Sequence, residues 1–129
     1  MENRIQYDII RAYGMSEHAR LFRNNVGNFW SGRPVKSKPG IVALKNPRRV
    51  QCGLANGSGD LIGIRTITIR EEDVGKQIGQ FVSLEVKGER TRTKDEQIAW
   101  AEFVRKRGGL AGIVRTIEEA EAILEGRGK

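Results

Sequence analysis

Three residues in the middle of the chain, Asp60, Glu85 and Lys87, have the types and spacing to hold a metal ion and activate water. Glu85 and Lys87 end the apolar run 80–87, and side chains alternate faces along a strand, so both should lie on one face. Two carboxylates, a backbone carbonyl such as that of Val86, and waters suit Mg²⁺ or Mn²⁺. Lys87 could then orient an attacking water or stabilise charge on a phosphate.

Each of these features also has an ordinary structural explanation. An acidic residue two positions before a lysine on a strand is usually a solvated or ion-paired edge. An Asp at the start of a strand is more often a turn residue. The glycines at 53, 57 and 59 would let the backbone approach a ligand, but the stretch 53–60 lacks the Gly-Lys-Ser/Thr ending of a nucleotide P-loop. The functional indication therefore comes from the ordered set rather than from one motif.

The elements that must position these residues alternate between helical and strand patterns. We predict helices over 2–13, 93–107 and 116–124, and strands over 41–44, 48–52, 60–69, 80–87 and 110–114. The stretch 17–25 fits a helix or a strand, and 26–40 fits an irregular or edge strand. The strands 60–69 and 80–87 should form an antiparallel hairpin with a long loop, which would bring Asp60 close to Glu85. This order predicts one α/β domain over 1–129, a mixed β-sheet flanked by helices, with a frayed tail at 126–129. The final strand–helix units favour parallel pairing at one edge of the sheet, since 93–107 is long enough for a crossover.

The helix predicted over 93–107 should direct Gln97 toward the strands. Thr93 and Glu96 form a capping box at its start. Gln97, Ala101 and Val104 share one face with Trp100, and three of these four side chains are apolar, so that face should be inward. The structural alternative for Gln97 is a hydrogen bond to the strand end. Trp100 and Trp30 are expected in the core rather than as platforms for nucleobases.

The composition favours a polyanionic partner. The chain has 23 Lys and Arg against 16 Asp and Glu, a net charge of +7 and a pI near 10.0. Nucleic acid is the commonest partner of such proteins. The lone Cys52 excludes an internal disulfide, and the lone His18 cannot build a zinc site without other soft ligands. No apolar run is long enough to span a membrane and no signal-peptide pattern is present, so we expect a cytoplasmic protein without a membrane partner.

The ordered set of motifs resembles the PD-(D/E)XK nuclease superfamily and, within it, the virus-type replication-repair nuclease (VRR-NUC) domain of the stand-alone phage and bacterial type. The resemblance covers nearly the whole chain. Gly59 stands where the family usually has Pro or Ser, a departure that removes no functional group. The residues that carry the resemblance are Arg23-Asn-Asn-Val-Gly27, Gly53-Leu with Gly59-Asp60-Leu-Ile-Gly63, Phe81-Val-Ser-Leu-Glu85-Val-Lys87, Thr93 with Gln97, and Gly108-Gly109-Leu-Ala-Gly-Ile113.

The resemblance implies a restriction-endonuclease-like core and a set of catalytic roles. Asp60 and Glu85 would hold Mg²⁺ or Mn²⁺, with the Val86 carbonyl as a third ligand. Lys87 would be the catalytic lysine, and Gln97 would lie beside it. The family also has an acidic residue on its first helix, a position that Glu2 fits better than Glu17. The resemblance further favours a strand over 21–25.

The function implied is a metal-dependent endonuclease that hydrolyses DNA phosphodiester bonds, acts on branched DNA such as Holliday junctions and forms a homodimer. It would work in the cytoplasm of a bacterium or a phage-infected cell. The alternative is a non-catalytic nucleic-acid-binding module that kept the nuclease fold. Polar and basic side chains on exposed segments are the candidate DNA contacts, although each could equally be solvated: Arg23, Asn24, Arg33, Lys36, Lys38, Arg90 and Arg92.

Overall fold

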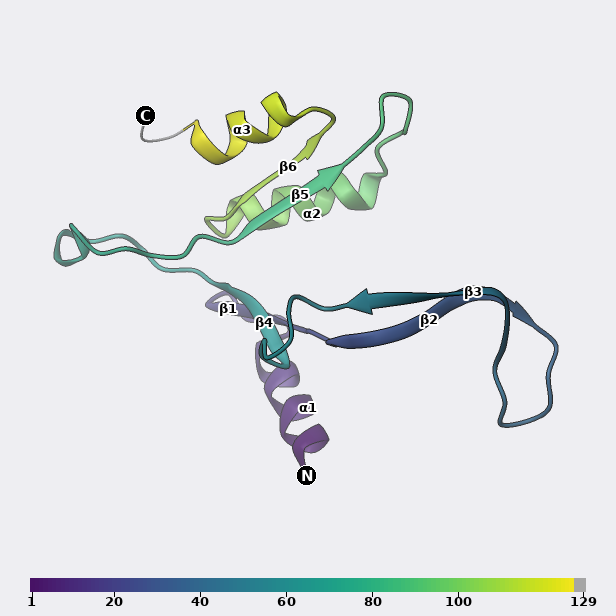
Figure 1. The fold of residues 1–129 in the computed structure, drawn as a ribbon. Helices are drawn as coiled ribbons and strands as arrows, with labels where there is room; N and C mark the ends of the chain where they lie inside the picture. Colours follow the sequence, from purple (N-terminus) through teal and green to yellow (C-terminus); the bar gives the residue numbers. More distant parts are fainter. Residues whose placement is uncertain (127–129) are drawn as a thin grey trace. The chain divides into compact units, whose positions relative to one another are not determined.

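A computed structural model describes residues 1–126 of the chain (Figure 1). Its elements are α1 (Glu2–Tyr13), β1 (Ala19–Arg23), β2 (Gly27–Val35), β3 (Ala43–Cys52), β4 (Leu61–Arg65), the 3₁₀ turn η1 (Glu71–Asp73), β5 (Val82–Val86), α2 (Asp95–Lys106), β6 (Leu110–Val114) and α3 (Ile117–Glu125). The chain divides into two compact units. Unit 1 is Met1–Gly14 with Leu21–Ile62, and unit 2 is Met15–Arg20 with the described residues from Gly63 onward.

Unit 2 is built on a parallel strand pair with a helix on each face. β5 and β6 pair in register from Val82↔Leu110 to Val86↔Val114, and α2 is the crossover between them (Figure 1). Ala111 belongs to the apolar cluster on the α2 side, whereas a Cβ at the next residue, Gly112, would meet the side chain of Ile123 in α3. Because successive residues of a strand point to opposite faces, α2 and α3 cover opposite sides of the pair.

The core of unit 2 is small. Ile64, Ala101, Val104 and Ala111 form its buried cluster, and the partly buried Phe81 and Phe103 pack against it. Two arginines of the same unit, Arg20 and Arg107, hold their guanidinium groups over the Phe103 ring at 4.9 and 4.7 Å from its centroid. Cationic groups over a ring face are attracted to it. Phe103 therefore packs against the apolar cluster and also binds two arginine side chains through its ring.

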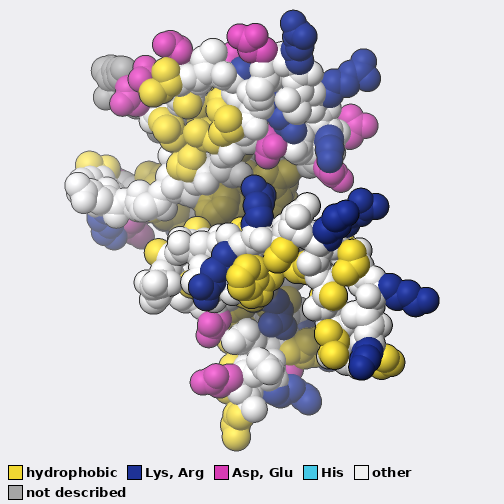
Figure 2. Space-filling view, turned by 45° about the vertical axis from the view of Figure 1, so that its right-hand side comes forward, with side chains coloured by type: hydrophobic (Ala, Val, Ile, Leu, Met, Phe, Trp, Pro, Cys, Tyr) yellow, Lys and Arg dark blue, Asp and Glu magenta, His cyan; other side chains and the backbone are white. Residues whose placement is uncertain are grey.

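Unit 1 contains α1 and an antiparallel hairpin of β2 and β3. The hairpin has a register shift at Gly32, where Asn46 and Pro47 oppose one residue. Asn46 has a φ of 51°, and a Cβ at Gly32 would lie 3.1–3.2 Å from atoms of Leu44, Lys45 and Pro47. These are the features of a β-bulge that packs closely against a glycine on the opposite strand. Lysine, arginine and hydrophobic side chains are all visible on the molecular surface (Figure 2).

The α/β class is confirmed, but the strand partners differ from those expected. The described strands pair in three two-stranded sheets, β1 with β4, β2 with β3 and β5 with β6, instead of one mixed sheet. The predicted hairpin of 60–69 with 80–87 is wrong, because β4 ends at Arg65 and β5 pairs with β6. Alternation along a strand specifies its two faces and leaves its neighbours open. The predicted parallel pairing at one edge is confirmed, since α2 is the crossover that joins β5 to β6.

Several local predictions are confirmed. α1 has the predicted bounds, and the ambiguous 17–25 stretch forms the strand β1. The Thr116 hydroxyl accepts the Glu119 N–H at 3.1 Å and begins α3. The prediction of two short strands over 41–44 and 48–52 is wrong, because one continuous strand, β3, spans this stretch with a bulge at Asn46 and Pro47.

The prediction of one domain stays a prediction, since the two units are described separately. Of the predicted tail, residues 127–129 lie outside the described part of the chain. Over the described residues, no helix combines the length and apolar character needed to cross a membrane.

Candidate active site

Glu85, Lys87 and Gln97 meet in unit 2, at the carboxyl end of β5. The Lys87 ammonium lies 3.3 Å from Glu85 Oε1, and the Gln97 amide Nε2 donates to the same oxygen at 2.7 Å. The Lys87 side chain is only 8% exposed, while that of Glu85 is 42% exposed. One carboxylate oxygen, Oε1, therefore receives two donors, and among the described residues no donor pairs with the other, Oε2. The predicted proximity of these three residues is confirmed.

Gln97 is held from both ends of its amide. Its Oε1 accepts the Lys94 N–H at 3.0 Å at the start of α2, while Nε2 donates to Glu85. Gln97 thus supplies the carbonyl that a capping box requires of its third helical residue. The predicted box of Thr93 and Glu96 is wrong by one residue, because the helix starts at Asp95 with Lys94 as its N-cap. This arrangement assigns the amide orientation through two different partners.

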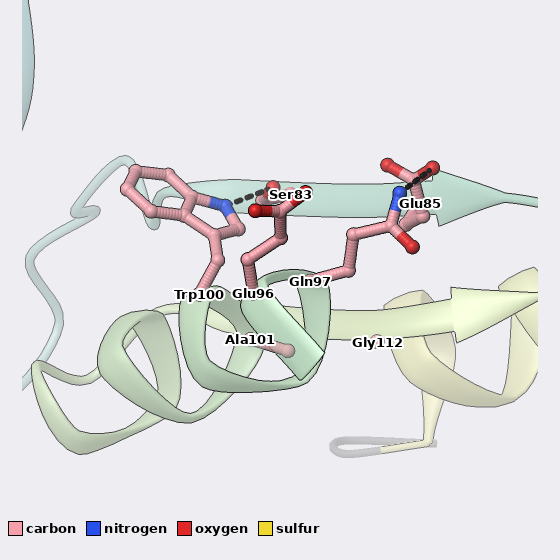
Figure 3. Close-up of a pocket in the computed structure, with 7 residues that line it drawn as sticks. All are labelled: Ser83, Glu85, Glu96, Gln97, Trp100, Ala101 and Gly112. Atoms are coloured by element: carbon pink, nitrogen blue, oxygen red, sulfur yellow. Dashed lines mark hydrogen bonds between the residues drawn. The ribbon is translucent and has the colours of Figure 1, made fainter. Parts of the chain in front are cut away.

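A hollow of about 210 Å³ adjoins Glu85 between β5 and α2 (Figure 3). Side chains of α2 point across it toward the strand, and Trp100 Nε1 donates to Ser83 Oγ at 2.8 Å (Figure 3). Glu96 also lines the hollow and gives it a second carboxylate. The sequence interpretation treated Glu96 as a capping residue and passed over Ser83. Strand alternation places Ser83 on the same face as Glu85 and could have indicated it.

Asp60 lies in unit 1, at the start of β4, after a loop held by Asn24. The Asn24 N–H donates to the Asp60 carbonyl at 2.8 Å. The Asn24 side chain donates to Ser58 Oγ and the Gly59 carbonyl, both at 2.8 Å, and accepts the Leu54 N–H at 3.0 Å. Asn24 is buried, at 7% exposure. Its amide is therefore fully occupied with the loop and is not free for the DNA contact that the sequence predicted.

A polar hollow of about 410 Å³ surrounds Asp60 in this unit. Arg23, a predicted DNA contact, lines it and donates to Gln6 Oε1 of α1 at 3.2 Å. From α1 the lining residues are Asn3 and Gln6, while the predicted acidic residue Glu2 is an exposed first-turn residue outside this lining. The alternative, Glu17, belongs to unit 2, where its carbonyl accepts from Arg107. A supporting role for Glu2 stays a prediction.

The donor atoms at both positions suit a hard cation. Glu85 and Asp60 offer carboxylate oxygens, and Val86 ends β5 beside Glu85. Among the described residues, no three or more His, Cys, Asp and Glu side chains are grouped so that they could hold a metal ion. A small number of oxygen ligands suits Mg²⁺ or Mn²⁺, because these ions keep several bound waters. Zinc sites instead use mainly histidine and cysteine ligands. Glu85 and Asp60 belong to different units, and each is described within its own.

The other predicted DNA contacts lie on exposed segments. Arg33 lies two residues before the end of β2, and Lys36 and Lys38 lie in the connection between β2 and β3. Arg90 and Arg92 are exposed in the loop between β5 and α2. Arg115 supports that loop by donating to the carbonyls of Gly88 and Thr91.

The comparisons with known proteins give no relative: no protein-family model matches the chain, and neither a curated protein nor a solved structure matches it significantly. The resemblance to the VRR-NUC domain thus rests on the sequence motifs alone.

Proposed function

We propose that the protein is a metal-dependent endonuclease that hydrolyses DNA phosphodiester bonds. The observation that carries the proposal is the buried Lys87 ammonium beside Glu85, with Gln97 donating to the same carboxylate oxygen. Lysine is seldom buried without a partner or a function. Here its partner is a half-exposed carboxylate at the mouth of a hollow, which is where a substrate phosphate could approach.

Each residue of the trio has a role in this proposal. Gln97 fixes the side chain of Glu85 through Oε1, which leaves Oε2 to bind the metal ion. Lys87 places a fixed positive charge where it can orient a water or stabilise the negative charge that develops on a phosphate. Because the ammonium is shielded from bulk water, that charge acts with less screening than an exposed lysine would.

Asp60 and Glu85 are the proposed carboxylate ligands of Mg²⁺ or Mn²⁺, with the Val86 carbonyl as a further ligand. When bound, such an ion lowers the pKa of a coordinated water and polarises a phosphoryl oxygen. Asn24 supports Asp60 through the loop hydrogen bonds given above. Asn24 thereby changes from a predicted DNA contact to a positioning residue.

The decisive experiment is incubation with labelled duplex, flap, splayed-arm and four-way junction DNAs, with Mg²⁺, Mn²⁺ or EDTA. We expect metal-dependent cleavage, strongest on branched DNA. The Lys87→Met variant, which keeps the length of the side chain without its charge, is the control for a contaminating nuclease. Cleavage by both proteins at equal rates, or by neither, would remove the proposal.

The second candidate is a non-catalytic nucleic-acid-binding module with the same fold. The net charge of +7 supports binding of nucleic acid in either case. A binding module has no need of a buried lysine joined to a carboxylate, and this favours the enzyme. DNA binding by the wild type without cleavage of any substrate in the panel would favour the module.

We further propose a homodimer, since paired cuts across a four-way junction require two equivalent sites. Unit 1 exposes apolar side chains, and an exposed apolar patch is typical of a surface that becomes buried in a protein–protein interface. A hollow of about 380 Å³ on the hairpin is lined by Trp30, Val42, Leu44 and Pro47. Trp30 is 63% exposed. Light scattering should give twice the chain mass. A monomer at micromolar concentration would overturn the dimer and leave the nuclease proposal intact.

A further inference from the structure

The β2–β3 hairpin concentrates the positive charge of the protein. Residues 27–52 contain no Asp or Glu. When their basic residues are set aside, the chain keeps 17 Lys and Arg against 16 acidic residues, so the hairpin holds six of the seven net positive charges. Those six residues are Arg33, Lys36, Lys38, Lys45, Arg48 and Arg49.

Strand register sorts these charges onto the two faces of the hairpin. Arg33 pairs with Lys45, and Ser31 pairs with Arg48. Paired residues share a face, and so do residues two apart on one strand, so Arg33, Lys45 and Arg48 form one group on one face. We call this group the basic face.

The opposite face of the hairpin has a different character. Trp30 pairs with Arg49, whose guanidinium lies 5.8 Å from the centroid of the indole ring. That contact partly occupies Arg49, and the same indole lines the apolar hollow. The two faces therefore suit different partners, because three cations lie together on the basic face and one lies on the other.

The basic face has no partner within the described protein. Arg33, Lys45 and Arg48 are exposed, and the ion pairs of the described residues lie elsewhere, at Arg4 with Asp8 and inside unit 2. Like charges on adjacent rungs of a ribbon repel one another and destabilise it. A bound polyanion would relieve this repulsion, and that relief would contribute to the free energy of binding.

We propose that the β2–β3 hairpin is a DNA-binding arm whose basic face lies against the sugar-phosphate backbone of duplex DNA. A two-stranded ribbon is narrow enough to enter the major groove, and the bulge at Gly32 allows it to bend. The proposal rests on DNA as the partner in the proposed function but not on cleavage. It adds Lys45 and Arg48 to the DNA contacts and gives Arg33 a defined neighbourhood.

The test compares two triple variants of equal charge. The first, Arg33→Gln with Lys45→Gln and Arg48→Gln, removes the basic face. The control, Arg65→Gln with Arg70→Gln and Lys106→Gln, removes three exposed cations of unit 2. Each lowers the net charge from +7 to +4. Binding of a labelled duplex is measured by fluorescence anisotropy in EDTA across a salt series, so that cleavage cannot interfere, and circular dichroism with a thermal melt establishes that each variant is folded.

Loss of three phosphate contacts should reduce the slope of log K against log salt by roughly 2.7, at roughly 0.9 per contact. Affinity near physiological salt should fall at least about tenfold for the basic-face variant, and by less than about threefold for the control. Equal losses of affinity in both variants would mean that only the net charge matters, and would overturn the proposal of a DNA-binding arm. So would an unchanged basic-face variant, or a wild type that binds anionic vesicles but no duplex.

The outcomes also separate the arm from the nuclease. If the basic-face variant alone loses binding while the wild type cuts no DNA with Mg²⁺ or Mn²⁺, the arm is supported and the nuclease proposal fails. If the wild type cuts DNA and both triple variants bind as it does, the arm fails and the nuclease proposal is untouched.

Discussion

Gln97 and Glu85 share a hydrogen bond of 2.7 Å that joins the first turn of α2 to the carboxyl end of β5. The same glutamine accepts the Lys94 N–H, so one amide both begins the helix and orients the carboxylate. Helix formation and organisation of the site are thereby coupled through one side chain. Substitutions at this position can separate the two roles.

Gln97→Glu should keep the helix start and lose the site. A glutamate can still accept the Lys94 N–H, but it cannot donate to Glu85 and it brings a like charge to that carboxylate. Hydrogen bonds to charged groups are worth about 1.5–3 kcal/mol, so DNA cleavage should fall by about tenfold or more. The melting temperature should fall as well, because the folded state loses the same bond, so cleavage is measured well below it. Unchanged kcat/KM would show that the bond to Glu85 has no role in the activity.

Gln97→Met is the matched control, because methionine fills the space and makes neither bond. It should lose cleavage as Gln97→Glu does. It should also lower the free energy of unfolding by about 1 kcal/mol through loss of the contact with the Lys94 N–H. Chemical denaturation of the two variants side by side measures this difference.

Lys87→Met should abolish cleavage and leave most of the DNA affinity. The methionine keeps the apolar stem of the side chain in place, and Glu85 remains partly solvated after it loses its partner. The ion pair is with a half-exposed carboxylate, so its loss should cost no more than about 1 kcal/mol. DNA binding in EDTA and cleavage in Mg²⁺ are measured on the same sample. A variant that cuts at the wild-type rate would exclude a catalytic role for Lys87.

Local pattern in the sequence was sufficient to predict one part of the site. Strand alternation placed Glu85 and Lys87 on one face of β5, and helical spacing turned Gln97 toward it, and all three meet. The role of Asn24 could not be predicted in this way. Its partners Leu54, Ser58 and Gly59 lie 30 to 35 positions away, and no local periodicity reports bonds of that separation.

The antiparallel partner expected for 80–87 is wrong for a related reason, whereas the parallel pair joined by a crossover over 93–107 is confirmed. The apolar pattern of 80–87 specifies a buried strand, but a buried strand can pair on either edge and in either direction. Pairing of β5 with β6 is decided by packing of α2 on both strands, which involves Ala101, Val104 and Ala111. A cluster that combines a helix with a strand is a property of the assembled unit.

Two glycines in the loop before Asp60 should respond differently to alanine. Both have positive φ, 82° at Gly53 and 87° at Gly57. A Cβ at Gly53 would lie 2.7 Å from atoms of Val26, whereas at Gly57 it would meet open space. Gly57→Ala should therefore cost about 1 kcal/mol from its backbone conformation, and Gly53→Ala at least about 1 kcal/mol more from the clash. Equal losses in thermal unfolding would contradict the tight packing of Gly53 on Val26.

Asn24→Ala should loosen the loop that carries Asp60. Three side-chain hydrogen bonds are lost, each worth about 0.5–1.5 kcal/mol, so the free energy of unfolding should fall by about 2–4 kcal/mol. The neighbour Asn25, an exposed amide, supplies the control Asn25→Ala, which should stay within about 0.5 kcal/mol of the wild type. If Asn24→Ala is as stable as Asn25→Ala, the loop is held by other means.

The last prediction concerns the metal and decides which carboxylates bind it. An ion that binds only the folded protein stabilises it by roughly 2.7 kcal/mol at about 100 times its Kd, so Mn²⁺ or Mg²⁺ should raise the melting temperature of the wild type. Glu85→Gln should abolish that gain, since an amide is a weaker ligand than a carboxylate. Asp60→Asn should abolish it as well if Asp60 is the second carboxylate. Glu96→Gln is the informative comparison, because Glu96 lines the same hollow as Glu85. Loss of the gain in Glu96→Gln with its retention in Asp60→Asn would assign the ion to Glu85 and Glu96 and exclude Asp60, while retention in Glu85→Gln would remove the metal site from this end of β5 altogether.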